Sequence, residues 1–542
     1  MLLDACLAVA FVAGLLMLGR AARSWTWQPT RIDAFLRGPW APAALGLLTI
    51  VAVRFVWRSF GEPGIFHDER AYLLQAEIFA RGRWTAPAPP VPAFFEQMHV
   101  FVEPAVFAKY PPAHAMMLVP GIWLALPGLM PALMAGIAGA LTFWLARRLS
   151  NAWTALLTWI LWTTAPVTLF WATSYFSEST TTVMWLAATS AAVLWLESGK
   201  QVYLVGVAAA VAWGFEARPL TTLALAVPLG FVIVRRFIEI GKWRAAAVPV
   251  LVGTVLLGLS PLWNQQTVGD WKVDPYPLYS RTYFPFDKPG FGIDPAPPLR
   301  AVPSELLPMD AFSRGVHDGY VPSAVPLAFA QRIQALLSFY AAGWRLVIGA
   351  LLIGALPRAR GAARFAVVAS VGLFVAYLAF AHPPEWVVYY VELLPALHFL
   401  AAGNLVRLLG QSEERTSDAS LHVSPTIARA SALAAAVLVP FCLSDLVRVR
   451  AAIDGRNAFH RRAAEVIRGA PPNSILFVRY PSGHDPHLAV TRNEVDLASA
   501  RSWIVYDRGA DDARLLSLAP NRQPYLLDPS TFRLERLALP QD

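Results

Sequence analysis

Cysteine and charge are both scarce in this 542-residue chain. The two cysteines, Cys6 and Cys442, lie within apolar runs and lack the spacing of metal ligands, so we predict neither a disulfide framework nor a zinc site. Only 15% of the residues are charged, whereas a soluble domain usually carries about 25%. Because 56% of the residues are hydrophobic, the composition predicts a membrane protein with many spans.

Three further absences narrow the function. The net charge of +9 is spread between apolar runs, as the positive-inside rule requires, rather than gathered in a basic module with interleaved aromatics. This distribution excludes nucleic acid as a partner. There is no glycine-rich nucleotide loop. The basic residues near the N-terminus, Arg20 and Arg23, follow the first apolar run instead of preceding it, which is the reverse of a signal peptide. We therefore predict a retained first span with its N-terminus outside.

What the chain has in abundance is long apolar runs. A span needs roughly 20 mostly apolar residues, fewer where the helix is buried among others. The sequence predicts an all-α polytopic membrane protein with about twelve spans, at 2–19, 41–58, 129–147, 152–170, 180–196, 201–216, 219–234, 246–262, 343–357, 365–381, 387–408 and 426–443. Basic residues recur in alternate loops, which places those loops in the cytoplasm.

Three outer segments remain, at 59–128, 263–342 and 444–542. Residues 113–126 and 327–340 are apolar but do not belong to the twelve predicted spans. We predict that they are helices lying in the membrane interface. In the tail, residues 474–479 and 502–506 alternate like buried strands. We therefore predict two domains, a membrane domain at 1–443 and a small α/β domain at 444–542.

The first outer segment opens on an unusual polar stretch, from Ile65 to Tyr72. Four adjacent ionisable residues at the mouth of a span must be solvated or paired. The neighbouring carboxylates Asp68 and Glu69 could serve as a general base or hold a cation. The alternative is a structural one, since acidic residues also stabilise the first turn of a helix.

Several short motifs follow in a fixed order. They are Asp68-Glu69 with Tyr72, Arg81-Gly82-Arg83-Trp84, Ala108-Lys109-Tyr110-Pro111-Pro112, Arg218-Pro219, and the outer run from Gly269-Asp270 to Gly290-Phe291-Gly292. Over about residues 41–408, this ordered set resembles the GT-C superfamily of membrane glycosyltransferases. The most similar branch is the group of protein mannosyltransferases and lipid A aminoarabinose transferases.

The resemblance implies an inverting enzyme that moves a sugar from a polyprenyl-phosphate carrier to a lipid, glycan or protein acceptor. The implied location is the inner membrane of a bacterium, with both termini and the active site on the periplasmic side. No cofactor is implied. A divalent cation held by Asp68, Glu69 and Glu178 remains an open alternative.

The resemblance also assigns roles to single residues. Asp68 is the expected base, with Glu69 and Glu178 as further catalytic candidates. Lys109 and Arg218 are expected to contact the phosphate of the donor, although Arg218 has the alternative of pairing with Glu216. The other substrate-binding candidates are His67, Tyr72, His382, Glu385 and Tyr390.

Two other classes of function fit the sequence. The first is a transporter or flippase of lipid-linked sugars, although transporters usually show inverted repeats and interrupted spans at mid-membrane. The second is a non-catalytic assembly subunit with the same fold.

Overall fold

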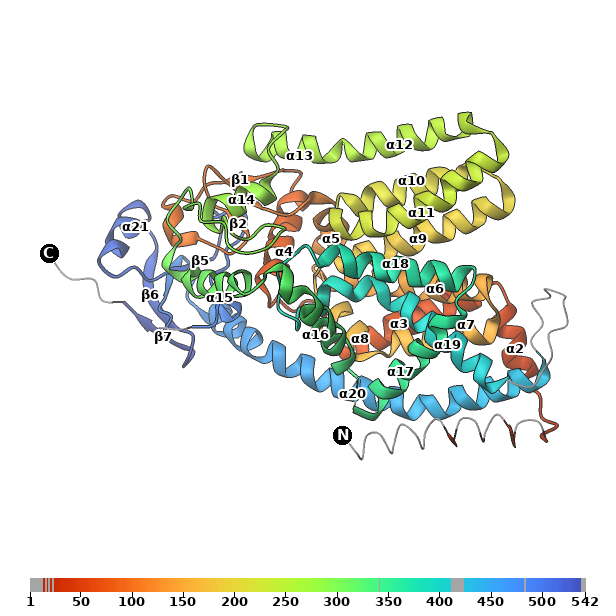
Figure 1. Ribbon diagram of the computed structural model, residues 1–542. Coiled ribbons are helices and arrows are strands. Elements are labelled where there is room, and N and C mark those ends of the chain that lie inside the picture. The colour runs from red at the N-terminus through yellow and green to blue at the C-terminus, as the bar shows by residue number, and fades with distance from the viewer. Residues whose placement is uncertain are drawn as a thin grey trace.

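The computed structural model describes residues 13, 14, 17, 20, 21, 24–340, 342–410, 424–481 and 484–537. Most of the chain forms a bundle of apolar helices (Figure 1). Its members are α2 (Thr30–Arg37), α3 (Ala41–Val56), α6 (Leu129–Leu149), α7 (Ala152–Thr163), α8 (Pro166–Ala172), α9 (Glu178–Ser198), α10 (Gln201–Phe215), α11 (Pro219–Ile240), α12 (Ala247–Leu257), α17 (Ala342–Ala355), α18 (Ala362–Tyr377), α19 (Leu394–Leu409) and α20 (Pro425–Gly469).

Helical structure occupies each predicted span from residue 41 onward. Within the described residues, five helices are long and apolar enough to cross a membrane, or seven if two bent helix pairs each count as one span. The predicted span 2–19, with Cys6, falls almost wholly outside the described residues. The total of twelve spans therefore stays a prediction.

Small residues bring α3 and α6 close together. A Cβ added to Gly46 would lie 2.8 Å from the carbonyl oxygen of Gly136 and 3.1 Å from the Cβ of Ala140. Without a hydrophobic driving force between helices in lipid, such close backbone contact is a main source of stability. Tight packing of α3 fixes the point at which the chain leaves the bundle and enters the first outer segment.

The outer segments fold between the bundle and the C-terminal end of the chain (Figure 1). The first contains α4 (His67–Ala80), a three-stranded sheet of β1 (Ala86–Pro87), β2 (Val100–Phe101) and β3 (Ala105–Ala108), and α5 (Pro112–Trp123). The second contains α13 (Leu259–Val268), α14 (Pro275–Tyr283), α15 (Leu307–Asp318) and α16 (Val325–Ser338). The predicted helices at 113–126 and 327–340 are thus present as α5 and α16.

The tail forms a four-stranded sheet with α21 (Asp512–Leu518). In spatial order, its strands are β5 (Ser502–Tyr506), β4 (Ser474–Val478), β6 (Gln523–Asp528) and β7 (Arg533–Arg536). β4 pairs in parallel with β5 and β6, and β6 pairs antiparallel with β7. The two predicted strands are therefore confirmed as β4 and β5. The predicted domain boundary at 443/444 falls inside α20, so one continuous helix joins the bundle to this C-terminal sheet.

The C-terminal sheet is packed onto the first outer segment. Phe94 and Phe95 are buried in one apolar cluster with Phe477 of β4 and Trp503 of β5. Among the described residues, four ion pairs also join the first outer segment to α20 and the residues after it. They are Arg492 to Glu77 (2.5 Å), Arg83 to Asp496 (2.6 Å), Arg81 to Asp496 (3.1 Å) and Arg461 to Glu62 (3.1 Å). Apolar burial is the main stabilising term here, and the ion pairs add orientation.

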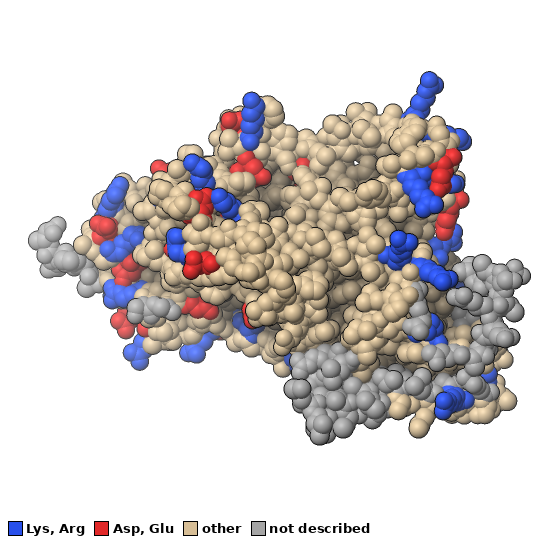
Figure 2. Space-filling view, viewed as in Figure 1, with Lys and Arg blue, Asp and Glu red and all other residues tan. Residues whose placement is uncertain are grey.

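Charged side chains gather at the two ends of the molecule on the face drawn in Figure 2, and the broad band between them is almost free of them. One end carries the C-terminal sheet and the outer segments, and the other carries the opposite ends of the bundle helices (Figure 1). Such an apolar band flanked by charge is what a bilayer requires of a protein that crosses it. The outer segments, with the polar stretch at 65–72, lie at one edge of this band.

Candidate active site

Asp68 lies in the first turn of α4, where the partial positive charge of the helix N-terminus favours a carboxylate. The hydroxyl of Tyr110 donates a hydrogen bond to Asp68 Oδ1. His99 Nε2 lies 3.7 Å from the same oxygen. The Asp68 side chain is 31% exposed, so the carboxylate is held on one side and open on the other. This is the geometry a general base needs to meet a substrate hydroxyl.

Glu69, its neighbour, is turned into the protein and is only 1% exposed. Its Oε2 accepts hydrogen bonds from the backbone N–H groups of Ile65 (3.0 Å) and Phe66 (2.9 Å). Its Oε1 accepts the N–H of Tyr175 (2.9 Å), just before α9. The Glu69 carboxylate therefore faces the protein interior and not solvent. Its carboxylate ties the start of α4 to the bundle, and in this way it fixes where Asp68 stands.

We expect Glu69→Gln to destabilise the protein by about 1–3 kcal/mol. The amide NH₂ would face a buried backbone N–H group whose hydrogen bond the carboxylate accepts in the wild type. The measurement is the thermal unfolding midpoint in detergent. Glu77→Gln on the same helix is the matched control. This variant loses one partly exposed ion pair, which should lower the free energy of unfolding by no more than about 1 kcal/mol. Equal losses in both variants would contradict the role of Glu69 as an anchor.

Lys109 follows β3 and is buried within tyrosine rings. Its Nζ lies 4.4 Å from the ring centroid of Tyr276, 5.1 Å from that of Tyr279 and 5.4 Å from that of Tyr110. No carboxylate within the described residues forms an ion pair with it. Burial lowers the pKa of Lys109, although the charges of Asp287 and Asp68 oppose that shift. A cation held only by aromatic faces is well placed to receive an anion.

Arg218, at the start of α11, is surrounded by acidic partners. It forms ion pairs with Glu178, the first residue of α9, and with Glu392 (Nε to Oε1, 3.4 Å). It also donates to the hydroxyl of Tyr377 (3.0 Å). The alternative pairing with Glu216 does not occur, because Glu216 accepts instead from Ser260 Oγ at 2.7 Å. Two carboxylates offset the charge of Arg218, whereas none is paired with Lys109.

A chain of contacts joins these groups into one site. The ring of Tyr72 stacks on that of Tyr110, with centroids 4.5 Å apart. The hydroxyl of Tyr72 donates to Ser177 Oγ (3.0 Å), and Arg218 contacts the same oxygen at 3.4 Å. The path from Asp68 to Arg218 therefore runs through Tyr110, Tyr72 and Ser177. Residues predicted from separate parts of the sequence are brought together here.

The three candidates from the segment before α19 behave differently from one another. His382 and Tyr390 are buried and lie in hydrogen-bond contact with each other (3.0 Å). Tyr389 links them to the site, because its ring lies 4.7 Å from that of His382 and 5.7 Å from the guanidinium of Arg218. Glu385 is exposed, and its carboxylate has no hydrogen bond or ion pair within the described residues. His67 belongs to the other side of the site and stacks on His487, with centroids 4.2 Å apart.

Two of the three carboxylates considered for a divalent cation, Glu69 and Glu178, are engaged elsewhere. Both oxygens of Glu69 accept backbone N–H groups, and Glu178 pairs with Arg218. In the part of the chain that the structure describes, no group of three or more His, Cys, Asp or Glu residues is arranged to hold a metal ion.

Sequence reasoning missed most of the aromatic wall. Tyr276, Tyr279, Tyr377 and Tyr389 all contact Lys109 or Arg218. Asp287 was also missed; its pKa is lowered, against the effect of burial, by a hydrogen bond from His317 and the charge of Lys109. There were two local signals: residues 274–292 are rich in tyrosine, and Tyr276 and Tyr279 lie in the outer run that matches the GT-C motifs.

Buried histidines predict a pH dependence of stability. Burial, reinforced by the nearby charge of Arg70, lowers the pKa of His460 to about 3, against about 6.5 in the unfolded chain. Below pH 6.5 the unfolded state binds the proton and the folded state does not, so acid favours unfolding. We expect His460 to lower the free energy of unfolding by about 2 kcal/mol at pH 5. His67 and His99, whose pKa values burial also lowers, act in the same direction.

The unfolding midpoint, measured from pH 7.5 to 5.0, should therefore fall with pH. The fall should be smaller in His460→Gln, which keeps an acceptor for Arg70 and cannot be protonated. An unchanged slope in that variant would show that His460 is not the group that resists protonation.

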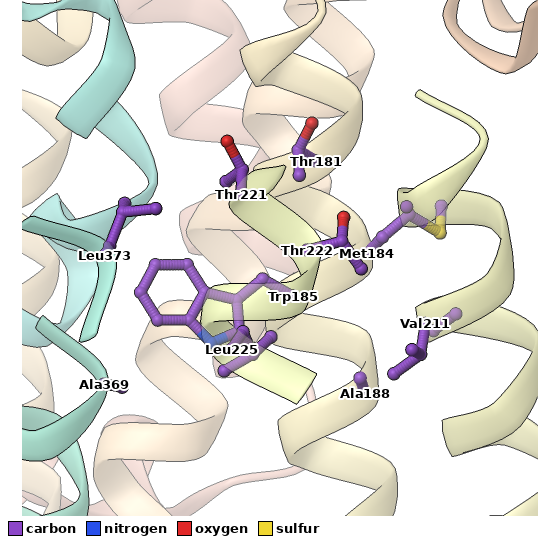
Figure 3. A pocket seen from close by; sticks show the side chains of 12 residues that line it. Thr181, Met184, Trp185, Ala188, Val211, Thr221, Thr222, Leu225, Ala369 and Leu373 are labelled. Atoms are coloured by element: carbon purple, nitrogen blue, oxygen red, sulfur yellow. The ribbon is translucent and has the colours of Figure 1, made fainter. Parts of the chain in front are cut away.

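The cavities of the bundle are small compared with the opening at its outer end. The one in Figure 3 lies between α9, α10, α11 and α18, with Thr181 and Thr221 at one end. It holds about 10 Å³, which is about the space of one water molecule. A polar pocket of about 270 Å³, lined in part by His67, lies beside the start of α4. Of these two cavities, the second is the one large enough for a substrate group.

No protein-family model matches the sequence, and no curated protein matches it. Solved structures are similar to this chain, among them the following three. ArnT from Cupriavidus metallidurans, bound to undecaprenyl phosphate, is 15% identical over 91% of each chain, with a TM-score of 0.49. The oligosaccharyltransferase AglB from Archaeoglobus fulgidus, tethered with an acceptor peptide, is 10% identical over 90% of this chain and 69% of AglB, with a TM-score of 0.44. The arabinofuranosyltransferase AftD from mycobacteria is 13% identical over 91% of this chain and 36% of AftD, with a TM-score of 0.38.

These structural neighbours are GT-C glycosyltransferases, the superfamily that the sequence motifs resemble. Every TM-score is below 0.5 and every identity is 15% or lower. We therefore argue function from this chain's own residues.

Proposed function

We propose that this protein is an inverting glycosyltransferase of the bacterial inner membrane. In this proposal it takes a sugar from a polyprenyl-phosphate donor and places it on an acceptor at the periplasmic side. The observation that carries the proposal is that an open carboxylate, Asp68, and a buried cation, Lys109, both contact Tyr110 in one aromatic site at the edge of the apolar band.

The proposed reaction is a single displacement. Asp68 removes the proton from an acceptor hydroxyl as that oxygen attacks the anomeric carbon of the donor sugar. A new glycosidic C–O bond forms while the bond between the anomeric carbon and the phosphate oxygen breaks. The electron pair of the broken bond leaves on polyprenyl phosphate, and the proton remains on Asp68 until it passes to water.

The leaving phosphate needs positive charge that is already in position. Lys109 fits this role, since none of the described carboxylates pairs with it and its tyrosine cage keeps it away from bulk water. Arg218 fits a different role. Its charge is offset by Glu178 and Glu392, so we assign it to holding α9, α11 and the segment before α19 in register around the sugar.

The tyrosines that surround the site fit a sugar substrate. Tyr276, Tyr389 and Tyr110 offer both a ring face and a hydroxyl, and an apolar wall with a few polar groups is typical of small-ligand sites. His382 and Tyr390, joined to the wall through Tyr389, then line the side of the site next to Arg218.

The test offers purified protein in nanodiscs a panel of polyprenyl-phosphate sugars, each radiolabelled in the sugar, with membrane extract as the source of acceptor. We expect one donor to lose its label to the acceptor fraction. Label that crosses the bilayer of a proteoliposome while still attached to its lipid would favour the flippase alternative. Binding of a donor without either process would favour the assembly subunit.

A further inference from the structure

A polar pocket of about 270 Å³ lies where the first outer segment, the second outer segment and the C-terminal sheet meet. Its walls include His67, Gln97, Glu305, Tyr480, Thr491 and Tyr506. Its volume is just below the range of about 300–1,000 Å³ typical of sites for drug-sized ligands. The proposed reaction leaves this pocket, and the C-terminal sheet that closes it, without a role.

Four polar atoms of wall residues are buried without a hydrogen-bond partner among the described residues. They are His67 Nε2, Glu305 Oε2, His484 Nε2 and Thr491 Oγ1. His67 is only 5% exposed. Buried polar atoms are nearly always hydrogen-bonded, so an unpaired one needs a ligand or an ordered water. A neutral imidazole and a carboxylate are suited to hydroxyl groups, which both donate and accept.

The positive charges near the pocket are already engaged. Arg70 donates to the carbonyl oxygens of Gly64 and His487, each at 3.2 Å. Arg508 forms an ion pair with Glu305 Oε1 at 3.1 Å. The N–H groups of Arg70 are directed at carbonyl oxygens and the charge of Arg508 is offset by Glu305, so neither arginine is aimed at a phosphate in the pocket. The chemistry favours an uncharged ligand rich in hydroxyl groups.

Two aromatic rings complete the wall. The ring centroids of Tyr480 and Tyr506 are 5.6 Å apart, and the two planes are tilted by 52°. The hydroxyl of Tyr480 is held in place, since it accepts the backbone N–H of Val490 at 2.7 Å. Aromatic faces beside a few fixed polar groups provide what a sugar ring requires, namely an apolar face for its C–H groups and partners for its hydroxyls.

The pocket adjoins the base from two directions. His67, in its wall, directly precedes Asp68 in α4. Gln97 and Met98, also in its wall, lead to His99, whose Nε2 lies 3.7 Å from Asp68 Oδ1. The pocket wall therefore includes a chain neighbour of Asp68 and the residues that lead to His99, which places the pocket next to the base.

From these observations we propose that the pocket binds a sugar ring of the acceptor, as part of a glycan or of a glycolipid, and presents one of its hydroxyls to Asp68. This inference rests on the proposed transferase function and adds the class of the acceptor. In this account the C-terminal sheet is the outer wall of the acceptor site.

The first arm of the test measures transfer. Thr491→Trp fills the pocket, and Glu305→Gln replaces a carboxylate in its wall without filling it. Both should raise the acceptor KM by at least about tenfold, the effect of losing a hydrogen bond to a charged group, and leave the donor KM unchanged. Ser517→Trp, on the exposed face of α21, is the matched control and should behave as wild type. Acceptor KM values that match wild type in both pocket variants would overturn the proposal while the transferase function stands.

The same arm identifies the source of the sugar. Label extracted into organic solvent indicates a glycolipid, and label in a water-soluble, protease-resistant fraction indicates a glycan; either supports the proposal. Label released by protease as glycopeptide, with the same dependence on Thr491, would overturn the acceptor class in favour of a protein.

The second arm needs no donor. Saturation-transfer NMR with a panel of methyl glycosides should detect binding to wild type and to Ser517→Trp, and lose it in Thr491→Trp. Glycoside binding without turnover of any donor would retain the pocket and reject the proposed function. No binding to the wild type would reject the pocket.

Discussion

Asp68→Asn is expected to reduce sugar transfer by about 10²–10⁴-fold, the usual contribution of a positioned general base. The amide cannot take the proton of the acceptor hydroxyl, yet its oxygen can still accept the hydrogen bond from Tyr110. Folding should be retained, since the Asp68 side chain is 31% exposed and the anchoring of α4 depends on Glu69. The measurement is kcat for label transfer, with the thermal unfolding midpoint recorded for the same preparation.

Asp270→Asn is the matched control for this change. Asp270 is an exposed carboxylate of the second outer segment and caps only the N–H of Lys272, at 3.0 Å. Its replacement should leave transfer within about twofold of wild type, as expected of a surface change that removes no charge from the site. Transfer that survives in Asp68→Asn would contradict the base assignment and move it to Glu178.

Lys109→Met is expected to lower kcat/KM for the donor by about 10²–10³-fold, the cost of removing one preorganised contact to a developing negative charge. Methionine is close to lysine in length and suits an aromatic cage. The stability should stay the same or rise. The substitution removes a buried cation that forms no ion pair within the described residues, so it leaves no buried carboxylate there without its partner. The measurement combines donor kinetics with the unfolding midpoint.

Lys272→Met controls for the loss of a positive charge. Lys272 is exposed, and its Nζ lies 5.2 Å from the ring centroid of Trp271. It should affect donor turnover little, and any effect should disappear at higher salt, where exposed charges are screened. If Lys109→Met and Lys272→Met were equally active, the phosphate would have to be held by another group, and Arg218 would be the next to examine.

Local pattern was enough to predict much of the fold. The apolar runs gave the helices from residue 41 onward, and alternation gave β4 and β5, because both signals lie in neighbouring residues. The continuity of α20 was not predicted. Its first half reads as a membrane span and its second as a soluble helix, and the helix continues through Pro440, a residue type that usually kinks or ends a helix.

Only part of the candidate site could be predicted, because a sequence pattern reports on neighbouring residues and not on contacts between distant segments. Asp68 and Lys109 lie in compact motifs, so sequence reasoning could find them. The tyrosine cage of Lys109 comes from α14, far along the chain, and only the packing of the outer segments brings Tyr276 and Tyr279 there. Glu216 is two residues from Arg218, yet the turn between α10 and α11 directs it to Ser260.

The most direct test of the central claim follows the lipid rather than the sugar. Wild type, Asp68→Asn and Lys109→Met are incubated with the donor and membrane extract, and free polyprenyl phosphate is measured by mass spectrometry of the organic phase. Wild type is expected to release one polyprenyl phosphate for each sugar transferred, and both variants almost none. Donor lipid that stays intact while sugar moves across the bilayer, or release that is equal in all three proteins, would contradict the account.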